Sequence, residues 1–155
     1  MEKVIQMIKD FFTQEAWNYT YSEGQSVFIT DIDTNGVLGK LHIVIKVKES
    51  FYTVHCILNN HAEKNNIALV AEYLHRANYG LNNGNFELDY EDGQILYKTF
   101  VNFKDSDISP TIVKDSIYLP IVMYNRYGKN LLKIMTGSDN PKQLIAEVEN
   151  GNENS

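Results

Sequence analysis

Hydrophobic residues near the start of the chain recur at helical spacing, which predicts an amphipathic helix over residues 2–16. The apolar stripe of this helix consists of Val4, Ile5, Ile8, Phe11 and Phe12. After a mixed segment, a strand is predicted from Val27, and the sequence Asp33-Thr34-Asn35-Gly36 that follows is typical of a turn.

Strict alternation of apolar and polar residues predicts a half-buried strand over residues 41–48. A two-residue turn at Glu49-Ser50 would place its apolar residues opposite those of the next strand. The predicted pairs are Leu41 with Leu58, Ile43 with Cys56, Ile45 with Val54, and Val47 with Tyr52. A shift of one residue would bury Thr53 and His55 instead, so the hydrophobic pattern specifies this register.

A second helical stripe, preceded by Asn65 and Asn66 as candidate caps, predicts a helix that Gly80 and Gly84 bring to an end. The stripe consists of Ile67, Val70, Tyr73, Leu74, Ala77 and Leu81. Apolar and acidic residues then alternate over residues 86–90, which predicts a strand, and Asp92-Gly93 predicts a type I′ hairpin turn. That turn would pair Tyr90 with Ile95, Leu88 with Tyr97, Phe86 with Thr99, and Glu87 with Lys98.

Ser109-Pro110 is typical of a helix start, and the apolar residues that follow predict one long helix. They are Val113, Ile117, Pro120, Tyr124, Tyr127, Leu131 and Ile134. Pro120 cannot donate a hydrogen bond to the carbonyl of Ser116, so we expect a kink or a break there. Gly137 is expected to end this helix, a short helix from Asn140-Pro141 to Glu149 follows, and residues 150–155 are expected to fray.

The predicted order is α-β-β-β-α-β-β-α, with a short C-terminal helix added, in a single domain over residues 1–149. Hairpins rather than crossovers join the strands, which predicts an antiparallel sheet of about five strands. With helices on one face of this sheet, the fold class is α+β.

Composition narrows the protein class. The 155 residues are 43% hydrophobic and 22% charged, as in soluble globular proteins. No apolar run is long enough to span a membrane. Near the N-terminus, charged residues are mixed with apolar ones, which is not typical of a signal peptide. A lone cysteine, Cys56, excludes an internal disulfide and favours a cytoplasmic location. The net charge of −6 disfavours a nucleic-acid partner.

Residues between 71 and 135 carry a resemblance to a known family. In chain order they are Leu74, Arg76, Ala77, Asn78 and Tyr79 at a helix end, Gly84 to Asp89, the turn Asp92-Gly93, the strand Ile95-Leu96-Tyr97, and Ile108-Ser109-Pro110. This pattern resembles the YbjN family of bacterial proteins, which share the fold of type III secretion chaperones. The resemblance implies a cytosolic, non-enzymatic regulator or binder of other proteins, without a known catalytic residue. The chaperone relatives imply a homodimer.

The signature residues also have structural interpretations. Asn78, beside Tyr79, is placed to satisfy the last carbonyls of its helix. Gly84 can adopt a positive φ in the turn that follows. Phe86 and Leu88 are expected to face the core, so the signature describes a fold rather than a reaction.

One acidic turn suggests an alternative. Asp31 and Asp33 match the first half of a calcium loop, and they also match the D-x-D-x-T nucleophile motif of haloacid-dehalogenase-like phosphatases. However, His42 stands where the calcium loop requires a glutamate, and strands flank the turn. An acidic Asn-Gly turn is also an ordinary hairpin signal. The alternative function is therefore a small-ligand or metal-dependent domain that uses Asp31, Asp33 and His42.

The long helix carries the candidate partner surface. Tyr118, Met123, Tyr124 and Tyr127 add aromatic and flexible side chains beyond what one seam can bury, which is typical of interface cores. The other interpretation is that two sides of this helix pack against the sheet and the first helix. The leading hypothesis is a non-enzymatic protein-binding domain without cofactors, in a regulatory or chaperone-like role, that forms a homodimer.

Overall fold

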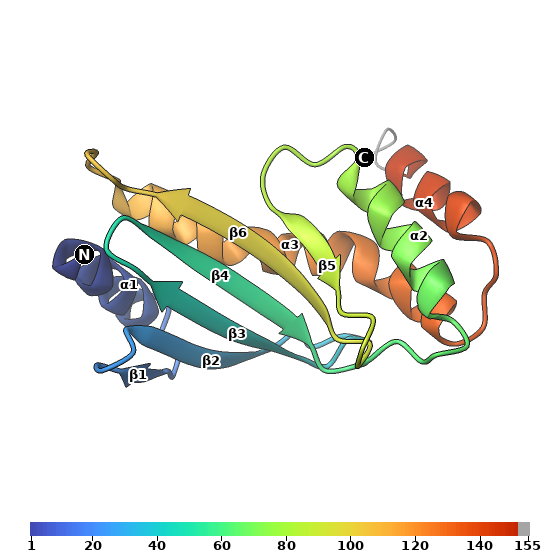
Figure 1. The fold of residues 1–155 in the computed structure, drawn as a ribbon, viewed down its shortest axis with the longest axis horizontal. Coiled ribbons are helices and arrows are strands. Elements are labelled where there is room, and N and C mark those ends of the chain that lie inside the picture. The colour runs from blue at the N-terminus through green and yellow to red at the C-terminus, as the bar shows by residue number, and fades with distance from the viewer. Residues whose placement is uncertain (152–155) are drawn as a thin grey trace.

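The computed structural model describes residues 1–151, which form a six-stranded antiparallel sheet and four helices (Figure 1). The strand order across the sheet is β1-β2-β3-β4-β6-β5. The elements are α1 (Glu2–Gln14), β1 (Thr20–Ser22), β2 (Val27–Asp33), β3 (Lys40–Val47), β4 (Phe51–Leu58), α2 (Ile67–Asn78), β5 (Asn85–Leu88), β6 (Ile95–Asn102), α3 (Pro110–Met135) and α4 (Pro141–Asn150).

The helices lie against one face of the sheet and beyond one of its ends. In Figure 1, α1 and α3 lie behind the sheet, whereas α2 and α4 pack together at the end of α3. The predicted α+β class is therefore confirmed. The additional strand is β1, which is only three residues long and too short to produce a hydrophobic period. None of the helices within residues 1–151 has the length and apolar character needed to cross a membrane.

The β3–β4 hairpin has the predicted register. Leu41 pairs with Leu58, Ile43 with Cys56, Ile45 with Val54, and Val47 with Tyr52. All of these side chains are buried against the helices. Burial raises the pKa of the Cys56 thiol well above its ordinary value, so this cysteine is a small core residue rather than a nucleophile.

The β5–β6 hairpin differs from its predicted register by two residues. Leu88 pairs with Ile95 and Phe86 with Tyr97, so the strand ends at Leu88 instead of Tyr90. The loop is longer than a two-residue turn because acidic side chains bond to its backbone. The carboxylate of Asp89 accepts from the N–H of Glu91 at 2.8 Å, and that of Asp92 accepts from Gln94 at 2.8 Å. The predicted opposition of Glu87 and Lys98 is therefore wrong, although the two form a diagonal ion pair.

Helix α3 continues through Pro120 without a break. The carbonyl of Ser116, which loses its helical partner to the proline, accepts a hydrogen bond from the Thr99 hydroxyl of β6 at 2.9 Å. The Ser116 hydroxyl donates to the carbonyl of Val113 and accepts from the Tyr52 hydroxyl of β4, both at 2.8 Å. The sheet therefore supplies the bond that the helix cannot make.

The predicted cap and end signals of α3 and α4 are confirmed, whereas α1 ends at Gln14 rather than Ala16 and α2 ends at Asn78, before Leu81. Ser109 caps α3, Asn140 caps α4, and Gly137 after α3 has a φ of +120°. Asn66 precedes α2 but does not cap it through its side chain. Instead, its amide donates to the carbonyl of Met135 at 2.8 Å and thereby joins the start of α2 to the end of α3. Asn150 belongs to α4, so the expected fraying does not begin there, and residues 152–155 lie outside the described part of the chain.

Candidate functional site

The long helix buries most of the residues that the sequence assigned to a partner surface. Tyr124 and Met123 are buried, and Tyr127 is only 2% exposed. The Tyr124 hydroxyl donates toward the carbonyls of Cys56 at 3.2 Å and Ile95 at 3.3 Å, between β4 and β6. The expectation that these side chains form an exposed surface is wrong, because α3 is enclosed by the sheet on one side and by α2 and α4 on another.

Tyr118, the fourth residue of that set, is half-buried and links α3 to α1. Its hydroxyl donates to the carboxylate of Glu15 at 2.6 Å, and Lys114 lies 3.3 Å from the same carboxylate. The hydrogen bond from Tyr118, followed by the effect of Lys114, lowers the pKa of Glu15. The Tyr118 ring also contacts Trp17 edge-on, with ring centroids 5.4 Å apart. Tyr118 therefore fastens two helices together.

The acidic turn of the alternative hypothesis is a β-hairpin. Asp31 pairs across the strands with His42, and its carboxylate lies 2.7 Å from Nδ1 of that histidine. Asp33 accepts a hydrogen bond from the N–H of Asn35 at 2.9 Å, which stabilises the turn. Within residues 1–151, no group of three or more histidine, cysteine or acidic side chains is arranged to hold a metal ion. The structure therefore brings Asp31 and His42 together, whereas the carboxylate of Asp33 is hydrogen-bonded within the turn.

The signature residues hold α2 against the edge of the sheet. The side-chain amide of Asn78 donates to the carbonyl of Phe86 at 2.9 Å and accepts from its N–H at 2.8 Å. Asn78 thus pairs with edge strand β5 as a neighbouring strand would, and the prediction that it satisfies the end of its own helix is wrong. Gly84 has the expected positive φ of +75°, and Phe86 is buried. Tyr79, in contrast, is exposed.

The turn at Asp92-Gly93 is also a packing site. Gly93 has a φ of +75°, and its carbonyl accepts from the N–H of Ala62 at 2.8 Å. The imidazole of His61 lies 2.9 Å from the carbonyl of Asp92. The segment that leads into α2 is therefore attached to the turn of the β5–β6 hairpin.

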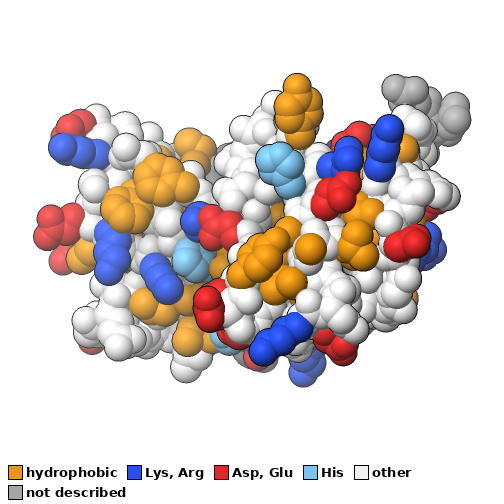
Figure 2. All heavy atoms as spheres, turned by 45° about the vertical axis from the view of Figure 1, so that its right-hand side comes forward, with side chains coloured by type: hydrophobic (Ala, Val, Ile, Leu, Met, Phe, Trp, Pro, Cys, Tyr) orange, Lys and Arg blue, Asp and Glu red, His pale blue; other side chains and the backbone are white. Residues whose placement is uncertain are grey.

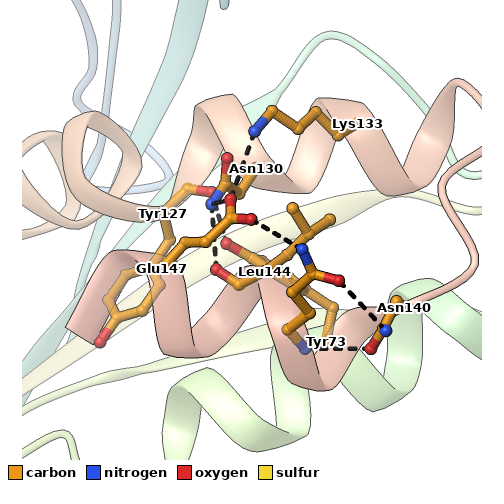
Figure 3. A network of polar contacts seen from close by, with 8 residues as sticks. Tyr73, Tyr127, Asn130, Lys133, Asn140, Leu144 and Glu147 are labelled. Carbon is orange, nitrogen blue, oxygen red and sulfur yellow. Dashed lines mark hydrogen bonds and ion pairs between the residues drawn. The ribbon is translucent and has the colours of Figure 1, made fainter. Parts of the chain in front are cut away.

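A polar network fixes α4 on α3 (Figure 3). Asn130 of α3 is buried and donates to the carbonyl of Leu144 at 2.9 Å. Glu147 of α4 lies 3.5 Å from Lys133 and accepts from Gln143 at 3.2 Å. The close-up shows the labelled side chains of Asn130, Lys133 and Glu147 directed toward one another between the helices. The network therefore attaches the C-terminal helix to α3.

The face of the sheet that α1 and α3 leave uncovered is the remaining candidate site. The strand registers place its side chains in rows that run across β3, β4 and β6. One row contains Lys46, Thr53 and Phe100, and the next contains Val44, His55 and Lys98. A third row contains His42, Ile57 and Leu96, flanked by Asp31 on β2 and Glu87 on β5.

This face has two different ends. Around Phe51 and Phe100 the charged residues on the strands are Lys46 and Lys98, with Lys48 directly after β3. Phe51 and Phe100 are diagonal neighbours whose ring centroids lie 5.2 Å apart, and Phe100 is 53% exposed. The left half of Figure 2 shows hydrophobic side chains beside basic ones on this side of the molecule. We call Lys46, Lys48, Phe51, Lys98 and Phe100 the aromatic–lysine patch.

Electrostatics agree with this arrangement. Partial burial lowers the pKa of His55, and the positive charges of Lys46 and Lys98 lower it further. Burial opposes ionisation of Glu87, but hydrogen bonds from Lys98 and Asn85 outweigh it and lower the pKa of Glu87. Glu87 raises the pKa of His55, but by less than the two lysines lower it, so positive charge prevails beside His55.

Sequence reasoning missed the aromatic–lysine patch although a signal for it was present. The register that buries Tyr52 and Val54 necessarily turns Phe51 and Thr53 to the opposite face. An aromatic residue at such a position differs from the polar residues expected on a solvated strand. Phe100, between Thr99 and Val101 on β6, carries the same signal.

Comparison with known proteins gives a likeness in fold. No protein-family model and no curated protein matches the sequence. Four chains among the solved structures match. One of these is YbjN, a proposed transcription regulator from E. coli, with a TM-score of 0.55 and 11% sequence identity. The match covers 78% of this chain and 90% of that chain.

The chain therefore has a YbjN-like α+β fold. At 11% identity this likeness describes the fold alone, because one fold can carry many functions.

Proposed function

We propose that this chain is a non-enzymatic protein-binding domain with a regulatory or chaperone-like role, and that its partner binds on the uncovered face of the sheet. The observation that carries the proposal is the pair of contacting rings of Phe51 and Phe100, which lies on a sheet face without a covering helix in residues 1–151. Exposed apolar clusters rimmed by polar residues mark interaction surfaces in soluble proteins.

The surroundings of the pair support binding of a protein segment. Val44, Ile57 and Leu96 add half-buried apolar area on the same face. Aromatic residues at the centre of an interface contribute most of its binding energy, and a polar rim excludes water around them. A proposed transcription regulator with a similar fold is compatible with a regulatory role.

Site-specific photo-crosslinking in the cells that produce the protein tests the proposal. A photoreactive phenylalanine analogue replaces Thr53, which lies beside Phe100 on the open face, and in a control it replaces Val122, an exposed residue of α3. We expect covalent protein adducts from position 53 and none from position 122, and mass spectrometry identifies the partner. Absence of adducts at position 53, or equal adducts at both positions, would contradict the proposal.

The homodimer remains a proposal of its own. Size-exclusion chromatography with light scattering decides it, because a dimer doubles the mass of the 17.8 kDa chain. A constant monomer mass across concentrations would contradict dimerisation and leave the binding of other proteins to the crosslinking experiment.

A further inference from the structure

The partner segment can be described by its chemistry. Resting on the proposed function, we infer that the aromatic–lysine patch binds an acidic segment that carries aromatic or large aliphatic anchors. Two observations lead to this inference, one geometric and one electrostatic.

The geometric observation is that the phenylalanine rings are accessible to a ligand. Phe51 and Phe100 stand on adjacent strands, and their tilted contact leaves Phe100 half exposed. Cross-strand aromatic contacts stabilise a sheet, but that role alone does not require an open ring face. The exposed part of Phe100, beside the partly buried Phe51, can therefore receive an apolar side chain.

The electrostatic observation is that cations surround the rings. Lys46 and Lys48 form no ion pair within residues 1–151, whereas Lys98 is partly neutralised by Glu87. On strands β3, β4 and β6, the rows through Phe100 and His55 contain no carboxylate. Glu49 lies in the β3–β4 turn next to Lys48 and not on one of these strands. A ligand with carboxylates around an apolar anchor complements this arrangement.

The chain as a whole favours an acidic peptide over a nucleic acid. Exposed aromatic residues with lysines on a sheet can also stack bases. However, the net charge of −6 repels a long phosphate backbone, whereas a short acidic segment need only contact the local lysines.

Fluorescence anisotropy with three labelled probes tests the inference on the full chain. The first is a synthetic peptide in which phenylalanines alternate with glutamates, the second replaces each glutamate by lysine, and the third is single-stranded oligothymidylate. We expect the acidic peptide alone to bind, and its affinity to fall with added salt.

Variants locate the binding site. The double variant Phe51→Ala, Phe100→Ala should bind the acidic peptide with an affinity lower by about tenfold or more, as expected when central aromatic anchors are removed. The double variant Lys46→Glu, Lys48→Glu should also lower the affinity for the acidic peptide. A second double variant, Lys46→Met, Lys48→Met, removes the charges without reversing them and tests the same point if the first variant misfolds. Lys40→Glu is the matched control, since Lys40 lies on β3 opposite Asp33 at the acidic end of the face. It should retain most of the binding.

Three results would overturn the inference. They are no binding of the acidic peptide, equal binding by patch variants and wild type, and patch-dependent binding of oligothymidylate in place of the peptide. If crosslinking at position 53 still captures a protein in these cases, the proposed function stands and only the acidic partner chemistry is lost.

Discussion

Gly93 combines a left-handed backbone with a close neighbour. A Cβ atom at this position would lie 2.0 Å from the carbonyl oxygen of Ala62, and the φ of +75° disfavours any side chain. Gly93 is one of the single residues that join segments distant in sequence, here the hairpin turn and the loop before α2. Tyr52 is another, because its hydroxyl reaches across the core from β4 to Ser116 of α3.

Gly93→Ala should destabilise the protein strongly. The backbone conformation alone costs roughly 1–3 kcal/mol for a residue with a side chain, and displacement of Ala62 adds to this. Urea unfolding measures the free-energy change. Gly24→Ala is the control, since a Cβ there meets nothing within 4 Å. Equal stability of the two variants would contradict the packing role of Gly93.

Tyr52 should make the stability depend on alkaline pH. Burial raises its pKa to about 12, against an ordinary value near 10. Because the folded pKa is the higher one, the stabilisation from Tyr52 is complete below pH about 10 and is lost as the pH rises toward 12.

The matched variant is Tyr52→Phe. At neutral pH it should cost about 1 kcal/mol through the lost hydrogen bond to Ser116, and above pH about 10 this difference should shrink. Urea unfolding across the alkaline range measures both effects. Tyr90→Phe, on the exposed hairpin turn, is the control. A pH-independent difference between Tyr52→Phe and wild type would refute the titration of Tyr52.

At the scale of elements, α3 is stable because the sheet supports it. Eleven of its residues are buried, and a proline lies among them. The carbonyl freed by Pro120 would be unpaired in the core if Thr99 did not donate to it. Helix and sheet are thus coupled by hydrogen bonds as well as by apolar packing.

A double-mutant cycle tests this coupling. Thr99→Val should cost about 1–3 kcal/mol, because it leaves the Ser116 carbonyl without a donor. In a Pro120→Ala background the backbone regains an N–H for this carbonyl, so the same Thr99→Val change should cost less. Chemical denaturation of the four proteins gives the interaction energy. Additive effects within error would show that Thr99 and Pro120 act independently.

At the scale of the molecule, α3 connects the two ends. Its first half contacts α1 and the sheet, and its second half contacts α2 and α4. Trp17 lies near the first end, with its ring centroid 5.5 Å from that of Phe11, whereas Leu144 is buried at the other. A structure joined in this way is expected to unfold as one domain.

The fluorescence of Trp17, the only tryptophan, and the helical circular dichroism should therefore report the same unfolding transition. Leu144→Ala should destabilise the protein by about 2–5 kcal/mol and shift both signals equally. If the Trp17 transition were unchanged in this variant, residues 1–149 would contain two independent units rather than the single domain predicted.

The sequence by itself determined which residues face the core. Alternation along the strands and helical spacing along α1, α2 and α3 follow from local backbone geometry, so these elements and the antiparallel α+β class could be read from the chain. The same rule specified the β3–β4 register once a two-residue turn was placed at Glu49-Ser50, because a shift of one residue would bury His55.

Only the tertiary structure decided which residues pair across the β5–β6 hairpin and which surfaces the helices cover. A shift of two residues leaves every side chain on the same face, so the pattern could not locate the β5–β6 register, which depends on side-chain bonds from Asp89 and Asp92 and on the contact of Ala62 with Gly93. The pattern also left open whether α3 presents a partner surface or packs on two sides, and the structure shows that it is enclosed and buries Tyr124 and Tyr127. Exposure of Phe100 depends on where the helices pack, which is a property of contacts distant in sequence.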